Sequence, residues 1–167
     1  EKNIAGNTKP KKIYLKHLAA ALYNIGFIAQ SHGDNSKALG YQLKCLKIDE
    51  QVGDKQEIAF SLNNIGASYY YLGDLANALE YWHKSLKIRE EIGDKRGSAI
   101  SYSSIGMVYY DQCNYPEAWK NYYASLKIYE ETGNRMNIAI ANENIGLVYA
   151  DQGNYPEALK NHFTSLK

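Results

Sequence analysis

Apolar residues recur along the chain at helical spacing, in stripes that short polar turns interrupt. Between positions 55 and 72 the stripe consists of Ile58, Leu62, Ile65, Gly66 and Tyr69. Intervals of three and four residues place these side chains on one face of an α-helix. Gly73 and Asp74 follow; glycine favours a helix C-terminus, and aspartate caps the next N-terminus. The pattern therefore predicts one helix over 55–72 and a second that begins near 75.

The second helix carries its own apolar stripe and ends at a similar turn. Its buried side is predicted to consist of Ala78, Leu79, Trp82, Leu86 and Ile88. Gly93-Asp94 closes it, and Gly53-Asp54 and Gly133-Asn134 close its counterparts. Along the whole chain the pattern predicts eight helices, over 13–32, 35–52, 55–72, 75–92, 95–112, 115–132, 135–152 and 155–167.

The helix pairs recur at a constant spacing, which identifies the chain as a repeat protein. The columns that recur together are Gly26, Gly66, Gly106 and Gly146; Ala38, Ala78, Ala118 and Ala158; and Leu46, Leu86, Leu126 and Leu166. A period kept over four copies without an insertion is typical of stacked structural repeats. We predict four units, at 13–54, 55–94, 95–134 and 135–167, with residues 1–12 as the remnant of a preceding repeat or as a linker.

The recurring glycines and the turn residues predict local geometry. A glycine in the middle of a helix costs about 1 kcal/mol relative to alanine. Its recurrence indicates that the partner helix approaches closely, and the alanine column of the second helix is expected to face it. Asp54 with Glu57, Asn114 with Glu117 and Asn154 with Glu157 have the spacing of capping boxes.

The run NIGASYYYLGDLANALEYWHKSLKI, at 64–88, resembles the tetratricopeptide repeat consensus. Ile65, Gly66 and Tyr69 match its first-helix signature, and Ala78 matches its second-helix alanine. The common repeat has 34 residues, and the repeat here is longer. This longer form is similar to repeats in kinesin light chains and in bacterial signalling proteins. The first unit departs from the pattern, because Ala29 replaces the tyrosine and Gln42 replaces the second-helix aromatic residue.

The resemblance implies an all-α fold, a right-handed α-solenoid of four tetratricopeptide units, with a concave groove lined mainly by first helices. Such a groove binds a peptide or protein segment. The residues expected to face it lie between the buried positions of the first helices. They are Tyr23, Asn24, Phe27, Asn63, Asn64, Tyr70, Tyr71, Ser103, Ser104, Met107, Tyr110, Glu143, Asn144 and Leu147.

Asparagine and tyrosine are the side chains of most interest in this set. The family uses asparagines at the positions of Asn24, Asn64 and Asn144 to bind peptide backbone, since an amide can both donate and accept. These asparagines could equally bond to neighbouring helices or face water. Tyr70, Tyr71 and Tyr110 could contact a ligand or pack between helices.

A carboxylate clamp of the kind found in chaperone-docking members is not expected, because its basic positions carry other residues. Those positions are Ala20, Phe60, Ile100 and Ile140. The expected groove is therefore neutral and polar-aromatic, and suits a peptide with apolar side chains.

The net charge of the chain and the lack of catalytic and metal-binding motifs argue against several classes of function. A formal charge of +1 argues against a nucleic-acid partner, and no apolar stretch approaches the length of a membrane span. The four histidines lie at unrelated repeat positions, so no metal or other cofactor is expected. Cys45 occupies a packing position, whereas Cys113 replaces a turn glycine and should be exposed. No catalytic motif appears, so we do not expect an enzyme.

The chain is expected to be a piece of a longer protein. It opens at Glu1 without an initiating methionine, and Glu1–Asn7 resembles the end of a preceding second helix. The interaction scaffold would then be a sensory or regulatory region of a signalling protein. Self-association through exposed repeat ends, giving a homodimer, is the alternative. The compartment stays open, with the cytoplasm favoured.

Overall fold

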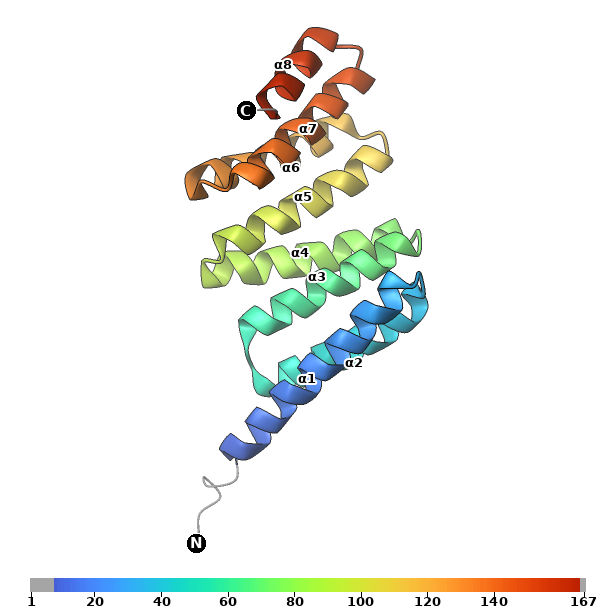
Figure 1. Cartoon of the computed structure of the whole chain (residues 1–167), viewed down its shortest axis with the longest axis vertical. Coiled ribbons are helices and arrows are strands. Elements are labelled where there is room, and N and C mark those ends of the chain that lie inside the picture. The colour runs from blue at the N-terminus through green and yellow to red at the C-terminus, as the bar shows by residue number, and fades with distance from the viewer. Residues whose placement is uncertain (1–7, 166–167) are drawn as a thin grey trace, which may run out of the picture. The chain divides into compact units, whose positions relative to one another are not determined.

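The structure of the chain, a computed structural model, describes residues 8–165 (Figure 1). Over this range the chain forms eight α-helices and no strand. The helices are α1 (Thr8–Ser31), α2 (Asn35–Val52), α3 (Lys55–Tyr71), α4 (Leu75–Ile92), α5 (Lys95–Asp111), α6 (Tyr115–Thr132), α7 (Arg135–Asp151) and α8 (Tyr155–Ser165). The predicted all-α class with four consecutive helix pairs is confirmed.

Helix boundaries follow the predicted turns except at the start of the chain. From α2 to α7, every helix begins at the predicted residue and ends within one residue of the predicted position. The prediction was wrong for α1, which begins at Thr8 rather than near residue 13. The resemblance of Glu1–Asn7 to the end of a preceding helix concerns residues outside the described range.

The chain forms two compact units, residues 1–88 and 89–167, and the boundary between them lies within α4. In the first unit, α2 packs against both α1 and α3. In the second unit, α6 packs against both α5 and α7, and α7 also packs against α8. Both units therefore place a second helix between two first helices, so their residues can be compared position by position.

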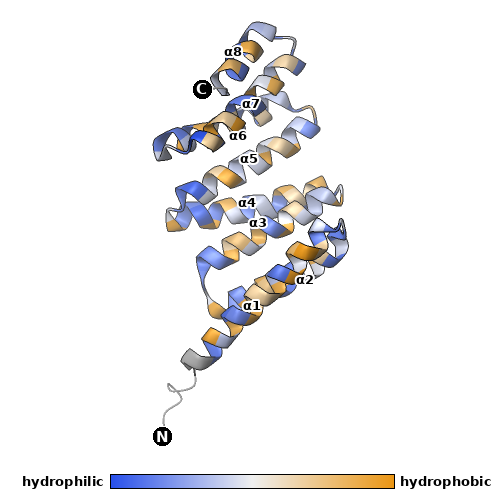
Figure 2. Cartoon of the chain, in the orientation of Figure 1, coloured by the Kyte–Doolittle hydropathy of each residue, from blue (hydrophilic) through white to orange (hydrophobic). Residues whose placement is uncertain are grey.

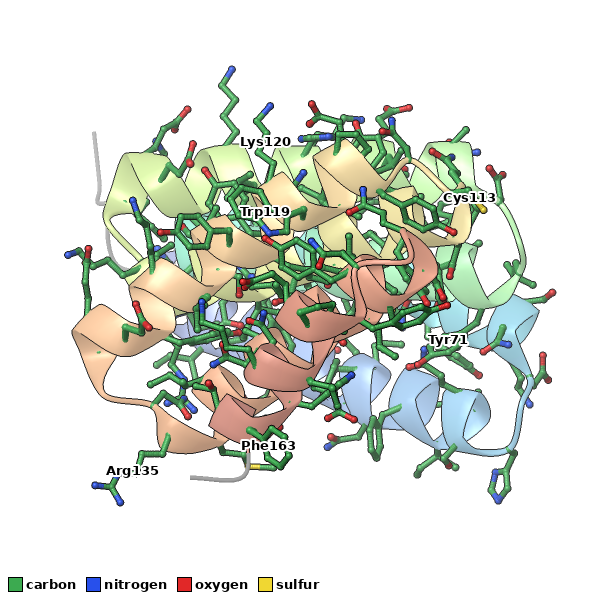
Figure 3. The ribbon with its side chains drawn as sticks, turned by 90° about the horizontal axis from the view of Figure 1, so that it is seen from above. Tyr71, Cys113, Trp119, Lys120, Arg135 and Phe163 are labelled. Carbon is green, nitrogen blue, oxygen red and sulfur yellow. The ribbon has the colours of Figure 1, made fainter. Side chains whose placement is uncertain are left out.

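Most of the helices are followed by a residue in the left-handed backbone conformation. Positive φ angles occur at Gly33, Gly53, Gly73, Gly93, Gly133 and Gly153. Cys113 takes the place of glycine after α5 with a φ of 56°, and within residues 8–165 no other residue except glycine has a positive φ. The prediction that Cys113 lies exposed in a turn is confirmed (Figure 3).

Side-chain caps form at only some of the predicted positions. The Asp74 carboxylate accepts a hydrogen bond from the backbone N–H of Asn77 at 3.1 Å, as an N-cap should. Asp54 and Asn114 make no such bond, so the capping boxes predicted at these two positions are wrong. The Asp54 carboxylate instead accepts a hydrogen bond from Lys16 Nζ at 2.8 Å.

The glycines within the first helices leave room for a large side chain on the next helix. A Cβ atom would lie 2.8 Å from the Trp82 ring if added to Gly66, 2.8 Å from the Tyr122 ring at Gly106, and 2.9 Å from the His162 ring at Gly146. The expectation that the alanine column faces the glycines was wrong for these three, whereas a Cβ on Gly26 would lie 3.2 Å from Tyr41 Cβ and 3.5 Å from the Ala38 carbonyl oxygen. A ring approaches the three, because the residue sixteen positions later projects onto the glycine.

The buried core follows the repeat columns, with one exception in α1. Ile65, Ile105 and Ile145 are buried, but Ile25, which was predicted to belong to the same stripe, is 44% exposed. In the first unit α1 packs mainly against α2. Apolar and polar residues alternate along every helix, as Figure 2 shows.

Candidate functional site

The predicted groove residues lie on the first helix of each repeat, on α1 and α3 in the first unit and on α5 and α7 in the second. None of the fourteen residues is fully buried. Seven belong to each unit, and each set is described within its own unit. Seven of the fourteen residues line three surface cavities.

The larger cavity of the first unit lies between α1 and α3 and has a volume of about 510 Å³. We call it the α1–α3 hollow; its lining residues are Phe27, Gln30, Ser31, Gly33, Asn35, Ala67 and Tyr71. Phe27 is 58% exposed and Tyr71 62% exposed. The lining carries no charged side chain, as expected for the groove.

A smaller cavity in the same unit, of about 190 Å³, lies among α1, α2 and α3. Tyr23 and Phe60 contribute aromatic rings whose centroids are 5.1 Å apart. Asp49 also lines the cavity, and Ser61 Oγ donates a hydrogen bond to its carboxylate at 2.6 Å. Burial raises the pKa of Asp49, and this effect outweighs the Ser61 bond, which lowers it.

Sequence reasoning missed the charged side chains of this smaller cavity, which are Lys16, Asp49 and Glu57. One signal was available. Asp49 stands in a column that carries Arg89 and Tyr129 at its other positions. All three residues are buried, so a carboxylate there required a polar partner.

The second unit has a cavity of about 210 Å³, the α5–α7 hollow. Its lining residues are Met107, Tyr110, Asp111, Tyr122, Asn144 and Leu147, four of which were predicted groove residues. The Tyr110 hydroxyl donates a hydrogen bond to Asp151 at 2.6 Å, which helps to raise the pKa of Tyr110 to about 12. Asp111 lies on the wall of this hollow and Asp151 lies beside it. The hollow is therefore more acidic than the neutral groove that was predicted.

The remaining predicted residues lie outside these cavities. Ser103 faces α6, because its hydroxyl lies 2.7 Å from Ser125 Oγ. The Tyr70 ring packs between helices, with its centroid 5.9 Å from that of Trp82. Asn24 and Glu143 are exposed. The others are Asn63, Asn64 and Ser104, which are partly buried.

The three asparagines at the family position have different surroundings. Asn24 is exposed, and Asn144 lines the α5–α7 hollow. The Nδ2 atom of Asn64 is buried and forms no hydrogen bond within the described residues. A role in binding peptide backbone remains a prediction for all three.

Among residues 8–165, no cluster of histidine, cysteine, aspartate and glutamate has the arrangement of a metal site. In the same range, no helix combines the length and the apolar character that a membrane span requires.

Comparison with known proteins connects this geometry to a family. A family model described as "Tetratricopeptide repeat" matches residues 17–91, 57–131 and 97–166. The chain belongs to the tetratricopeptide repeat family. Its four helix pairs are tetratricopeptide units, and the family resemblance noted in the sequence is confirmed. No curated protein matches the sequence significantly.

Several solved structures share this fold. BtubC (BKLC) from P. vanneervenii is 19% identical, with a TM-score of 0.81 over 90% of this chain and 63% of that chain. The apo form of RapI is 21% identical, with a TM-score of 0.81 over 90% of this chain and 43% of that chain. A STAND protein with a tetratricopeptide repeat sensor, from Pyrococcus horikoshii, is 21% identical, with a TM-score of 0.80 over 90% of this chain and 24% of that chain. The chain thus spans less than two thirds of each of these proteins.

Proposed function

We propose that this tetratricopeptide segment is a protein-interaction scaffold that binds a peptide or protein segment along its first helices. The observation that carries the proposal is the α1–α3 hollow. It exposes the rings of Phe27 and Tyr71 on an uncharged wall. Exposed aromatic residues that line a concave surface are typical of binding sites, since they offer contact area at a low cost in side-chain entropy.

The second unit supports the same function. Met107 and Leu147 supply apolar surface in the α5–α7 hollow, and the Asn144 amide can donate to and accept from a peptide backbone. Asp111 on the wall favours a peptide with a basic or hydroxyl-bearing residue at this point. Each hollow would bind a peptide segment within its own unit.

Peptide selection on the immobilised chain tests the proposal, followed by measurement of Kd with Tyr71→Ala and Tyr155→Ala. Both tyrosines are largely exposed, at 62% and 66%, but Tyr155 lies on α8, outside the hollows. We expect Tyr71→Ala to weaken the selected peptide about tenfold and Tyr155→Ala to leave Kd unchanged, because one well-packed aromatic contact contributes that much. Equal Kd values for the two variants would reject the first-helix site.

Within a larger protein, the segment would serve as a sensory or regulatory region. The support is the similarity to a STAND protein that is described as having a tetratricopeptide repeat sensor. This chain corresponds to 24% of that protein. Fusion of the segment to its own neighbouring sequence, with and without the selected peptide, would show whether binding changes the activity of the flanking region.

Self-association is a second candidate, and α8 carries the observation that favours it. Tyr155, Leu159 and Phe163 are exposed at four-residue intervals, and Phe163 points away from the ribbon in Figure 3. Sedimentation velocity over a hundredfold range of concentration, with Phe163→Glu as the variant, tests this candidate. A mass that stays monomeric throughout would reject it.

A further inference from the structure

A third kind of surface lies in the second unit, around a buried arginine at the end of α4. The cavity has a volume of about 460 Å³ and shares no residue with the α5–α7 hollow. We call it the Arg89 pocket; its lining residues are Arg89, Glu90, Gly93, Lys95, Ser98, Tyr102, Ile128 and Glu131. Neither the family resemblance nor the first-helix groove accounts for it.

The repeat itself shows that this pocket is unusual. Four residues at this junction differ from both of their equivalents in the neighbouring repeats. They are Arg89 (Asp49 and Tyr129), Gly97 (Glu57 and Asn137), Ser98 (Ile58 and Ile138) and Tyr102 (Leu62 and Asn142). The four departures lie close together, and they introduce a cation, two hydroxyl groups and a glycine against which Arg89 and Asp94 pack.

Arg89 is 5% exposed, and among residues 8–165 Asp94 is the one carboxylate that acts on its charge. Its Nη1 atom donates to the Gly97 carbonyl at 2.5 Å and to Ser101 Oγ at 3.1 Å. Within the described part of the chain no carboxylate forms an ion pair with it, and burial lowers the pKa of its guanidinium while Asp94 counteracts this. Asp94 therefore offsets only part of the cost of burying this charge, so a further anionic partner would be stabilising.

The hydrogen-bonding capacity of Arg89 is only partly used. A guanidinium carries five N–H groups on three nitrogens, and both hydrogen bonds found in the described residues come from Nη1. Nε and Nη2 form the edge that binds a carboxylate through two parallel hydrogen bonds. Gly97 lets the Arg89 and Asp94 side chains approach the backbone of α5 closely, because a Cβ at that position would meet the Asp94 carboxylate and would lie 2.8 Å from Arg89 Nε.

The other polar groups of the pocket complete a binding surface for a single negative charge. The Ser98 side chain lines the cavity, and its hydroxyl can donate a hydrogen bond to a carboxylate oxygen. The carboxylates at the rim are already engaged. Glu90 accepts a hydrogen bond from the Tyr102 hydroxyl at 2.7 Å, and Glu131 pairs with Lys95 at 2.9 Å.

We propose that the Arg89 pocket binds a carboxylate group, held by the Nε and Nη2 edge of Arg89 and by the Ser98 hydroxyl. A carboxylate fits better than a phosphate for two reasons. Its planar shape matches the guanidinium edge, and its single charge meets less repulsion from Glu90 and Glu131 than a dianion would. The carboxylate could belong to a small organic acid or to the C-terminus of a peptide.

Titration of the 167-residue chain with sodium acetate, monitored by ¹⁵N NMR, tests the proposal. We expect saturable shifts of the Arg89 Nε–H signal and of the Ser98 amide, and none with acetamide, which is neutral. An acetylated tripeptide with a free C-terminus and its amidated form make up the second arm. Tighter binding of the free-terminus peptide identifies a chain terminus as the ligand, and equal binding identifies a small acid. Shifts that do not saturate, or tighter binding of inorganic phosphate, would overturn the proposal.

Two variants separate binding from structure. Arg89→Lys keeps the charge but loses the planar edge, so acetate should bind at least about tenfold more weakly. Ser98→Ile introduces the residue that both neighbouring repeats carry at this position, so the fold should tolerate it while the pocket is filled. We expect it to abolish the acetate shifts.

The control variant lies in the same unit. Leu147→Ala, in the α5–α7 hollow, should leave acetate binding unchanged. Glu131→Gln should strengthen acetate binding a few-fold, because it removes a rim charge and releases Lys95. Unchanged acetate affinity in both Arg89→Lys and Ser98→Ile would show that Arg89 has a purely structural role.

Discussion

The junction between α2 and α3 in the first unit and the junction between α4 and α5 in the second use the same positions with opposite charges. The first buries Asp49 against Ser61, and the second buries Arg89 against Ser101. The serine donates to the carboxylate in one case and accepts from the guanidinium in the other, because a hydroxyl can do both. At both junctions, therefore, the buried charge is paired with a hydroxyl on the next helix, and the other neighbours of each site decide which charge it holds.

The third junction, between α6 and α7, has neither the buried charge nor the serine. Tyr129 occupies the equivalent position and is buried, and Ala141 replaces the serine. Both belong to one apolar core cluster. The hydroxyl is thus present where the partner is charged and absent where the partner is an aromatic ring.

Reversing the charge at the second junction should have the largest effect. Arg89→Asp would bury a carboxylate beside the Gly97 carbonyl, which is an acceptor, and near Asp94. We expect the free energy of unfolding to fall by about 3 kcal/mol, the cost of an uncompensated buried charge. Urea denaturation measures this. A loss below about 1 kcal/mol would mean that Ser101 alone can accommodate either charge.

The room around Arg89 gives the next largest effect. Gly97→Ala would place a methyl group against the Asp94 side chain and 2.8 Å from Arg89 Cδ, so it should destabilise the fold by about 2 kcal/mol through overpacking. Gly40→Ala is the matched control, since Gly40 also lies in a helix but has nothing within 4 Å. There we expect a gain of up to about 1 kcal/mol from helix propensity. Similar changes in melting temperature for the two variants would contradict this account.

Removing each hydroxyl compares the two junctions directly. Ser61→Ala takes a donor from the buried carboxylate of Asp49 and should cost about 1.5 kcal/mol. Ser101→Ala should cost about 1 kcal/mol or less, because Arg89 keeps its bond to the Gly97 carbonyl. Thermal unfolding of both variants tests the order, and a larger loss for Ser101→Ala would reverse it.

Most of the fold could be predicted because the repeat marks its own turns. Gly-Asp and Gly-Asn pairs, with Cys113-Asn114 in their place after α5, predicted where the helices end. Thr8 at the start of α1 has no such signal before it. The glycines were correctly identified as points of close approach. The partners of three of them were assigned to the wrong column, because spacing shows which residues share a face but not how far a Trp82 ring extends.

The candidate site was less predictable for a related reason. Exposed positions such as Phe27 and Tyr71 follow from helical phase, and the structure places both in one hollow. The charged cavities depend on pairs of residues from different helices, such as Asp49 with Ser61. The departure of Arg89 from its column is visible in the sequence, but the space that Gly97 leaves for its guanidinium appears only when the helices are packed.

The smallest effect expected is that of Asp49→Asn, and its sign depends on pH. Burial raises the pKa of Asp49 in the folded chain, so the folded state holds this proton more tightly than the unfolded state does. The free energy of unfolding therefore decreases as the pH rises from the ordinary pKa to the raised one, and it stays lower above that. Asparagine has no such proton, and its side-chain oxygen can still accept the Ser61 bond. At pH 7 Asp49→Asn should be as stable as the original chain or more stable, by up to about 1 kcal/mol, and this advantage should vanish below the ordinary pKa of 3.8. A variant that is less stable than the original chain at pH 7 and regains stability in acid would show that the ionised Asp49 carboxylate stabilises this junction.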